Sequence, residues 1–106
     1  MTDHEDRYWL EKAIDLSRSC PPPETAFSVG AIIVDARQII STGYSRETDP
    51  HDHAEEVAIS KLLPGDPRLA TATIYSTLEP CSKRASRPRT CTELIIAAGI
   101  GRVALA

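Results

Sequence analysis

The spacing of apolar and polar positions divides the chain into short helical and extended segments, separated by proline, glycine or polar runs. Residues 5–19 place apolar side chains at three- and four-residue spacing, which predicts an amphipathic helix that the prolines at 21–23 end. Residues 29–34 are continuously apolar, as in a strand that is buried on both faces. Residues 35–37 can turn the chain into a second strand over 38–43, so this region predicts a hairpin.

The second half of the chain alternates between helical and extended patterns. Its predicted elements are a helix over about 53–63 that Pro64 and Gly65 end, a strand over 71–78, a helix over 90–98 with Gly99 at its C-terminal cap, and a strand over 102–105. A chain of 106 residues is large enough for one hydrophobic core but not for two. We therefore expect residues 1–106 to form a single α/β domain.

Composition narrows the class of protein. The longest apolar run, over residues 94–100, is far too short to cross a bilayer, and the acidic residues 1–6 do not resemble a signal peptide. Three cysteines in a chain with no export signal argue for reduced thiols and a cytoplasmic location. We therefore expect a cytoplasmic protein that has thiols available for binding a metal.

The charge is distributed unevenly. The net charge is −3, but the segment 82–90 holds a basic cluster: Lys83, Arg84, Arg87 and Arg89. An acidic protein with only five aromatic residues is a poor general binder of nucleic acid, so we do not expect a nucleic-acid partner. The cluster suits contact with a substrate phosphate, and a solvated basic loop explains it equally well.

Four residues carry the candidate chemistry: His53, Glu55, Cys81 and Cys91. An imidazole and two thiolates can hold Zn²⁺ and leave a fourth position for water, whose pKa then falls to roughly 7. Glu55, two residues after the histidine, is placed to move protons rather than to bind the metal. The pattern predicts a catalytic zinc site with His53, Cys81 and Cys91 as ligands and Glu55 as the acid/base.

Structural explanations compete with each of these assignments. Glu55 also fits a capping box with Asp52 as N-cap. Its neighbour Glu56 lies on another side of the helix, where we expect it to face solvent. The cysteines could be small buried hydrophobic residues. Cys20 could supply a fourth zinc ligand, which would close the site and leave a non-catalytic, zinc-stabilised binding module.

Taken together, these residues resemble the cytidine/deoxycytidylate deaminase superfamily, and within it the pyrimidine deaminase of riboflavin biosynthesis. The segments that carry the resemblance are residues 29–34, 43–44, 53–55, 77–82 and 91–99. The resemblance implies a three-layer α/β/α cytidine-deaminase-like sheet, here without the last helix and strand. It also implies Zn²⁺ on His53, Cys81 and Cys91, with Glu55 shuttling protons while a small aminopyrimidine releases ammonia.

The chain departs from that family near the substrate. Ala26 and Phe27 stand where the family commonly has Asn-Pro, and the stretch between Cys81 and Cys91 is one residue longer and more basic than usual. Phe27 is a candidate for stacking on the ring, and the basic cluster for binding a phosphate on the substrate. A cytosine nucleoside or nucleotide, or another aminated heterocycle, is the alternative substrate. Homo-oligomerisation, common in the superfamily, would cover the edge of the last strand.

Overall fold

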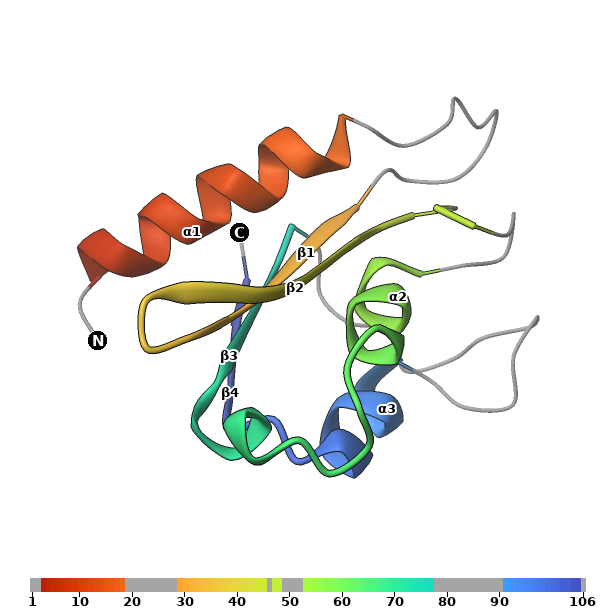
Figure 1. Cartoon of the computed structure of the whole chain (residues 1–106). Helices are drawn as coiled ribbons and strands as arrows, with labels where there is room; N and C mark the ends of the chain where they lie inside the picture. The colour runs from red at the N-terminus through yellow and green to blue at the C-terminus, as the bar shows by residue number, and fades with distance from the viewer. Residues whose placement is uncertain (1–2, 19–28, 46, 49–52, 78–90, 106) are drawn as a thin grey trace.

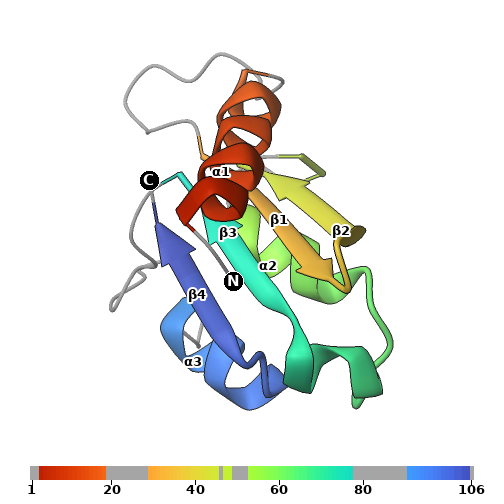
Figure 2. The same ribbon diagram turned by 90° about the vertical axis from the view of Figure 1, so that its left-hand side faces the viewer.

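A computed structural model describes residues 3–18, 29–45, 47–48, 53–77 and 91–105 of the chain (Figure 1). Its elements are α1 (Asp3–Ser17), β1 (Gly30–Asp35), β2 (Gln38–Tyr44), α2 (Ala54–Ser60), the 3₁₀ helix η1 (Pro67–Thr71), β3 (Thr73–Ser76), α3 (Cys91–Ala98) and β4 (Arg102–Leu105). The strands form one sheet. Helix α1 covers one face of it, and α2 and α3 cover the other (Figures 1 and 2), which is the predicted α/β/α arrangement. In this described part, no helix combines the length and apolarity needed to cross a bilayer.

The sheet has the order β2-β1-β3-β4. Strand β1 is antiparallel to both of its neighbours, whereas β3 and β4 are parallel. Parallel neighbours need a crossover connection, and α3 lies within it. In this register Ala31 of β1 pairs with Gly43 of β2 on one side and with Ser76 of β3 on the other. These three residues therefore point to the same face of the sheet.

The hairpin predicted from the sequence is confirmed. Strands β1 and β2 are joined by a two-residue turn, in which Ala36 (φ 49°) and Arg37 (φ 63°) both adopt the left-handed conformation. That backbone is typical of the tight turns whose twist matches two antiparallel strands, although Asn and Gly are the residues that favour it. The turn therefore forms although Ala36 and Arg37 are not the residues that favour its left-handed backbone.

Large apolar side chains join α1 to its face of the sheet. Ile32, Val34 and Tyr75 of the sheet pack with Ala13 of the helix, and Trp9, Leu10 and Leu16 surround them. At the edge of this layer the Asp6 carboxylate accepts a hydrogen bond from the Tyr75 hydroxyl (3.0 Å) and two from the Arg102 guanidinium (2.9 and 2.6 Å). One acidic residue of α1 thereby links β3 and β4.

Smaller side chains form the core on the opposite face. The buried cluster there consists of Ala31, Ile33, Ala54, Ala58, Ala72, Ile74 and Ile95. Gly43 lets β2 approach α2 closely, because a Cβ atom at this position would collide with the Ala54 carbonyl oxygen and lie 2.6 Å from the Ala58 nitrogen. The first turns of α2 are therefore held directly against the sheet.

Helix α2 is shorter than the predicted 53–63 and ends at Ser60. The Ser60 hydroxyl donates to the Val57 carbonyl (2.8 Å), and the Leu62 N–H donates to the Ile59 carbonyl (3.1 Å). Both contacts span three residues, so they tighten the end of the helix instead of extending it. Gly99 has a φ of 76°, which agrees with its predicted place after the last turn of α3.

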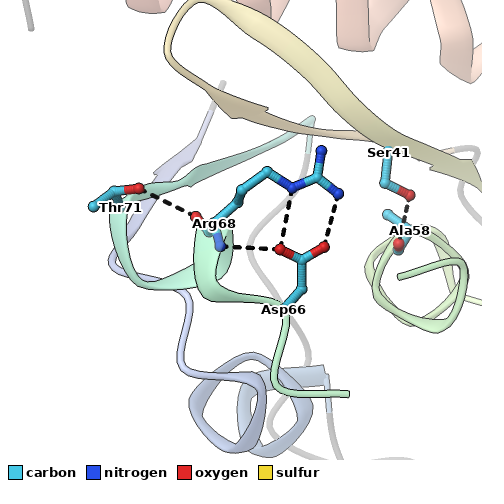
Figure 3. A network of polar contacts seen from close by, with 5 residues as sticks. All are labelled: Ser41, Ala58, Asp66, Arg68 and Thr71. Carbon is cyan, nitrogen blue, oxygen red and sulfur yellow. Dashed lines mark hydrogen bonds and ion pairs between the residues drawn. The ribbon is translucent and has the colours of Figure 1, made fainter. Parts of the chain in front are cut away.

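The sequence did not predict η1, whose last residue, Thr71, is the first residue of the strand expected over 71–78. Figure 3 shows how Asp66 begins it: the carboxylate accepts the Arg68 N–H (3.0 Å) and two guanidinium hydrogen bonds (3.1 and 2.7 Å). The hydrogen bonds from the Arg68 side chain are the main cause that lowers the pKa of Asp66 to about 2. This local turn competes with extended backbone, so β3 begins only at Thr73.

Candidate active site

His53 is the N-cap residue of α2. Its backbone is extended (φ −98°, ψ 148°), and its carbonyl accepts the Val57 N–H (3.0 Å). The His53 N–H donates to Oε1 of Glu56 (3.4 Å). The alternative that paired Asp52 with Glu55 in a capping box is therefore not supported: the N-cap is His53, and the half-buried Glu56 is its partner. Capping thus does not account for Glu55.

Glu55 points into the molecule. Its side chain is 4% exposed, and its Oε2 atom accepts a hydrogen bond from the Ser76 hydroxyl at 2.8 Å. Ser76 is itself fully buried at the end of β3. Burying a carboxylate is costly unless it is hydrogen-bonded, so this contact offsets part of that cost. The residue predicted as acid/base is thus the one acidic side chain of α2 that is turned toward the sheet.

The strand ends beside Glu55 are held together. The Thr77 N–H donates to the Gly30 carbonyl (3.1 Å), and the Gly30 N–H donates to the Thr77 hydroxyl (3.2 Å). Ser76 therefore lies where β1 and β3 are linked through both backbone and side chain. The chain continues from this point toward Cys81, five positions after Ser76 in the sequence.

Helix α3 brings the other predicted ligand segment into the same layer. Cys91 is its first residue, and Ile95, one turn later, shares a buried cluster with Ala54 of α2. Figure 1 shows α2 and α3 on the same face of the sheet. The two helices that carry His53, Glu55 and Cys91 therefore pack together.

The remaining predicted site residues lie outside the described part of the chain. These are Cys20, Phe27, Cys81, Lys83, Arg84, Arg87 and Arg89, and for Cys91 only the backbone is described. Among the residues described in full, no three His, Cys, Asp or Glu side chains gather as a metal site. The predicted zinc ligands could not form such a group here, because the side chains of Cys81 and Cys91 are not among the residues described in full. The half-buried imidazole beside a buried, non-capping carboxylate fits the zinc chemistry predicted from the sequence.

Comparison with known proteins identifies the family. The family described as "Cytidine and deoxycytidylate deaminase zinc-binding region" matches residues 3–106. The chain belongs to this family. The match confirms the resemblance predicted from the sequence, and the family description confirms zinc as the cofactor.

Individual relatives extend the comparison. The diaminohydroxyphosphoribosylamino-pyrimidine deaminase of Schizosaccharomyces pombe is 47% identical over 96 residues, covering 89% of this chain and 23% of the relative. The structure of Acinetobacter baumannii RibD superposes with a TM-score of 0.77 at 31% identity, covering 97% of this chain and 28% of that one. The Aspergillus oryzae Rib2 deaminase, solved in complex with DARIPP, has a TM-score of 0.73 at 30% identity and covers 89% of this chain and 63% of that one.

These likenesses confirm the cytidine-deaminase-like fold. The chain spans about a quarter of the length of the curated relatives it matches.

Sequence reasoning missed Ser76. A signal was present in the strand itself, because Ile74 and Ser76 lie two residues apart and so point to the same face. A serine in an apolar row suggests a polar partner across the interface. Identifying Glu55 as that partner required the order of the strands and the position of α2 on the sheet.

Proposed function

We propose that this chain is a zinc-dependent hydrolytic deaminase of an amino-substituted pyrimidine, of the diaminohydroxyphosphoribosylaminopyrimidine type. The observation that carries the proposal is the buried Glu55, two residues after His53, which capping does not explain and which Ser76 holds at 2.8 Å. The relatives support the substrate class, since the S. pombe protein is named for this activity and the A. oryzae enzyme was solved with DARIPP.

We assign His53, Cys81 and Cys91 as the zinc ligands. His53 is suited to this role because its backbone is fixed as the N-cap of α2. When bound, zinc supplies Lewis-acid activation of water at neutral pH. A structural zinc site closed by a fourth protein ligand would need no buried carboxylate beside it, so the position of Glu55 favours the catalytic form.

Glu55 carries the protons in this mechanism. Its carboxylate takes a proton from the attacking water and delivers it to the ring nitrogen next to the carbon that bears the amine. After the carbon–oxygen bond has formed, the same side chain transfers the second proton of the water to the amine. The carbon–nitrogen bond then breaks, ammonia leaves, and a carbonyl remains. Burial of Glu55 excludes bulk water from competing for these protons.

Substrate contacts come from residues outside the described part. We assign ring stacking to Phe27 and the binding of a substrate phosphate to Lys83, Arg84, Arg87 and Arg89. A phosphoribosyl substituent of the kind named for the S. pombe relative would supply that phosphate. Covering of the β4 edge by a second copy of the chain also stays a prediction, supported by Val103, which is 41% exposed.

The direct test is a panel of substrates assayed for ammonia release. The panel pairs diaminohydroxyphosphoribosylaminopyrimidine with its dephosphorylated form, cytidine and deoxycytidylate, each with zinc-loaded and chelator-treated protein. We expect release only from zinc-loaded protein, with the phosphorylated diaminopyrimidine turned over fastest. Preference for cytidine or deoxycytidylate would overturn the substrate assignment, and zinc-loaded protein inactive on every compound would overturn the enzymatic one.

A further inference from the structure

Ser76 is the buried polar residue that contacts the proposed proton carrier. It is fully buried on β3, and the apolar side chains of Ala31, Ile33 and Ile74 share its face of the sheet. Its hydroxyl donates to Oε2 of Glu55 at 2.8 Å across the interface between sheet and helix. A polar side chain among these apolar neighbours is thus directed at the carboxylate.

We infer that Ser76 is a positioning residue, which holds the Glu55 carboxylate in the orientation that proton transfer requires. This inference rests on the proposed function, because it gives Glu55 the same role. A glutamate side chain has three rotatable bonds, and its carboxylate can rotate unless one of its oxygens is fixed. A hydrogen bond to Oε2 from a rigid strand fixes that rotation. Proton transfer depends on heavy-atom distances of about 2.6–3.2 Å, so a rotated carboxylate would transfer protons more slowly.

The location of Ser76 suits this role. The neighbouring Thr77 is tied to Gly30 through two hydrogen bonds, so the strand end that carries the donor is rigid. Gly43 permits close contact of α2 with the sheet, which places the acceptor. Removing a partner that orients a metal ligand typically lowers activity about 10- to 100-fold, and we expect a similar factor for the partner of Glu55.

The chain contains a matched control for this contact. Ser41 on β2 is also buried (8% exposed), and its hydroxyl also donates to α2, at 2.6 Å (Figure 3). Its acceptor is the backbone carbonyl of Ala58, one turn beyond Glu55, and no catalytic group. Ser41→Ala and Ser76→Ala therefore each remove a serine hydrogen bond from the same interface, but only Ser76→Ala removes one from the carboxylate.

The experiment compares Ser76→Ala, Ser76→Thr and Ser41→Ala, each loaded with zinc and each checked for zinc content. We expect Ser76→Ala to lower kcat for ammonia release about 10- to 100-fold, with KM within about twofold and zinc stoichiometry unchanged. Ser41→Ala should keep kcat while losing a similar amount of melting temperature. Ser76→Thr, which retains a hydroxyl, should recover most of the lost kcat.

A second measurement requires no turnover. In metal-free protein, the melting temperatures of Ser76→Ala, Glu55→Ala and the double variant should be non-additive, because each single change removes one partner of the same hydrogen bond. Additive shifts would overturn the inferred contact, as would an unchanged kcat in Ser76→Ala. If Glu55→Gln is inactive but Ser76→Ala is fully active, only the present inference fails. If Glu55→Gln itself retains turnover, the proposed function fails and the inference fails with it.

Discussion

Helices α1 and α2 cover opposite faces of one sheet and bury different kinds of side chain against it. On the α1 face the buried side chains are mostly apolar, and the charged groups Asp6 and Arg102 meet at the edge of the layer. On the α2 face the core is made of smaller residues, and a carboxylate, Glu55, lies inside it. The first arrangement contributes to stability at little cost, whereas the second buries a carboxyl group, which is costly unless it is hydrogen-bonded.

The two faces of the sheet use acidic residues in different ways. Asp6 is paired with a guanidinium and a phenol that satisfy it near the solvent, as structural carboxylates commonly are. Glu55 lies in the interior, where its carboxylate accepts a hydrogen bond from the Ser76 hydroxyl. The burial of Glu55 agrees with the acid/base role proposed for it in the zinc-binding family to which the chain belongs.

The largest expected effect comes from adding one methyl group where each helix approaches the sheet. A Cβ at Gly43 would collide with the Ala54 carbonyl oxygen of α2, and one at Gly30 with the Ala13 carbonyl oxygen of α1. Both Gly→Ala changes should cost about 1–3 kcal/mol of unfolding free energy or more, measured by chemical denaturation. Because only Gly43→Ala displaces the first turn of α2, it alone should also weaken zinc affinity, measured with a chromogenic chelator. If Gly43→Ala and Gly30→Ala bound zinc with equal affinity, the expected difference between the α2 face and the α1 face would be contradicted.

A smaller effect is expected at the rim of the α1 face. Hydrogen bonding to Arg102, the largest cause, keeps the pKa of Asp6 below its usual value of 3.8. A carboxylate with a lowered pKa contributes stability above its unfolded-state pKa and loses it as the pH falls through the folded one. Asp6→Asn should therefore cost about 1 kcal/mol at pH 7, a modest value because Arg102 is partly exposed, and the difference from the wild type should shrink below pH 3.8.

Asp15→Asn is the matched control on the same helix, since Asp15 pairs with Arg18 where both side chains are largely exposed. That variant should change stability very little at any pH. Neither variant should alter kcat, because both act on the face opposite Glu55. If Asp6→Asn lost the same unfolding free energy at every pH, packing and not charge would account for its effect.

The smallest effect is expected at the hairpin turn, which belongs to neither face. Ala36 has a φ of 49°, and asparagine tolerates this conformation better than alanine does. Ala36→Asn should raise the unfolding free energy by about 0.5 kcal/mol, and Ala36→Val should lower it, because a β-branched side chain is strained there. Thermal melts of the two variants provide the measurement. A stabilising Ala36→Val would contradict the turn geometry.

Much of this architecture could be predicted from local patterns. The hairpin, the helix ended by Gly99 and the strand over 102–105 depend on periodicity and turn chemistry within a few residues, and the structure confirms them. Other features depend on competition between local contacts. The carboxylate of Asp66 favours a 3₁₀ turn over the expected start of a strand, and the cap of α2 lies at His53, one residue later than predicted.

The candidate site was predictable in its residue types but not in its supporting contacts. His53 and Glu55 stand out by spacing, because the chemistry needs an imidazole and a carboxylate near each other. The hydrogen bond from Ser76 joins residues 21 positions apart and exists because β3 lies next to β1 and α2 packs over both. No local pattern encodes such a contact.

The measurement that tests the central claim most directly compares Glu55→Gln with Glu56→Gln. The two glutamates are adjacent on α2, and Gln at 56 keeps the oxygen that accepts the His53 N–H. Zinc content and ammonia release are measured on the same zinc-loaded samples. We predict that Glu55→Gln binds zinc as the wild type does but releases ammonia at least about a thousandfold more slowly, while Glu56→Gln stays active. Wild-type ammonia release from zinc-loaded Glu55→Gln would contradict the account.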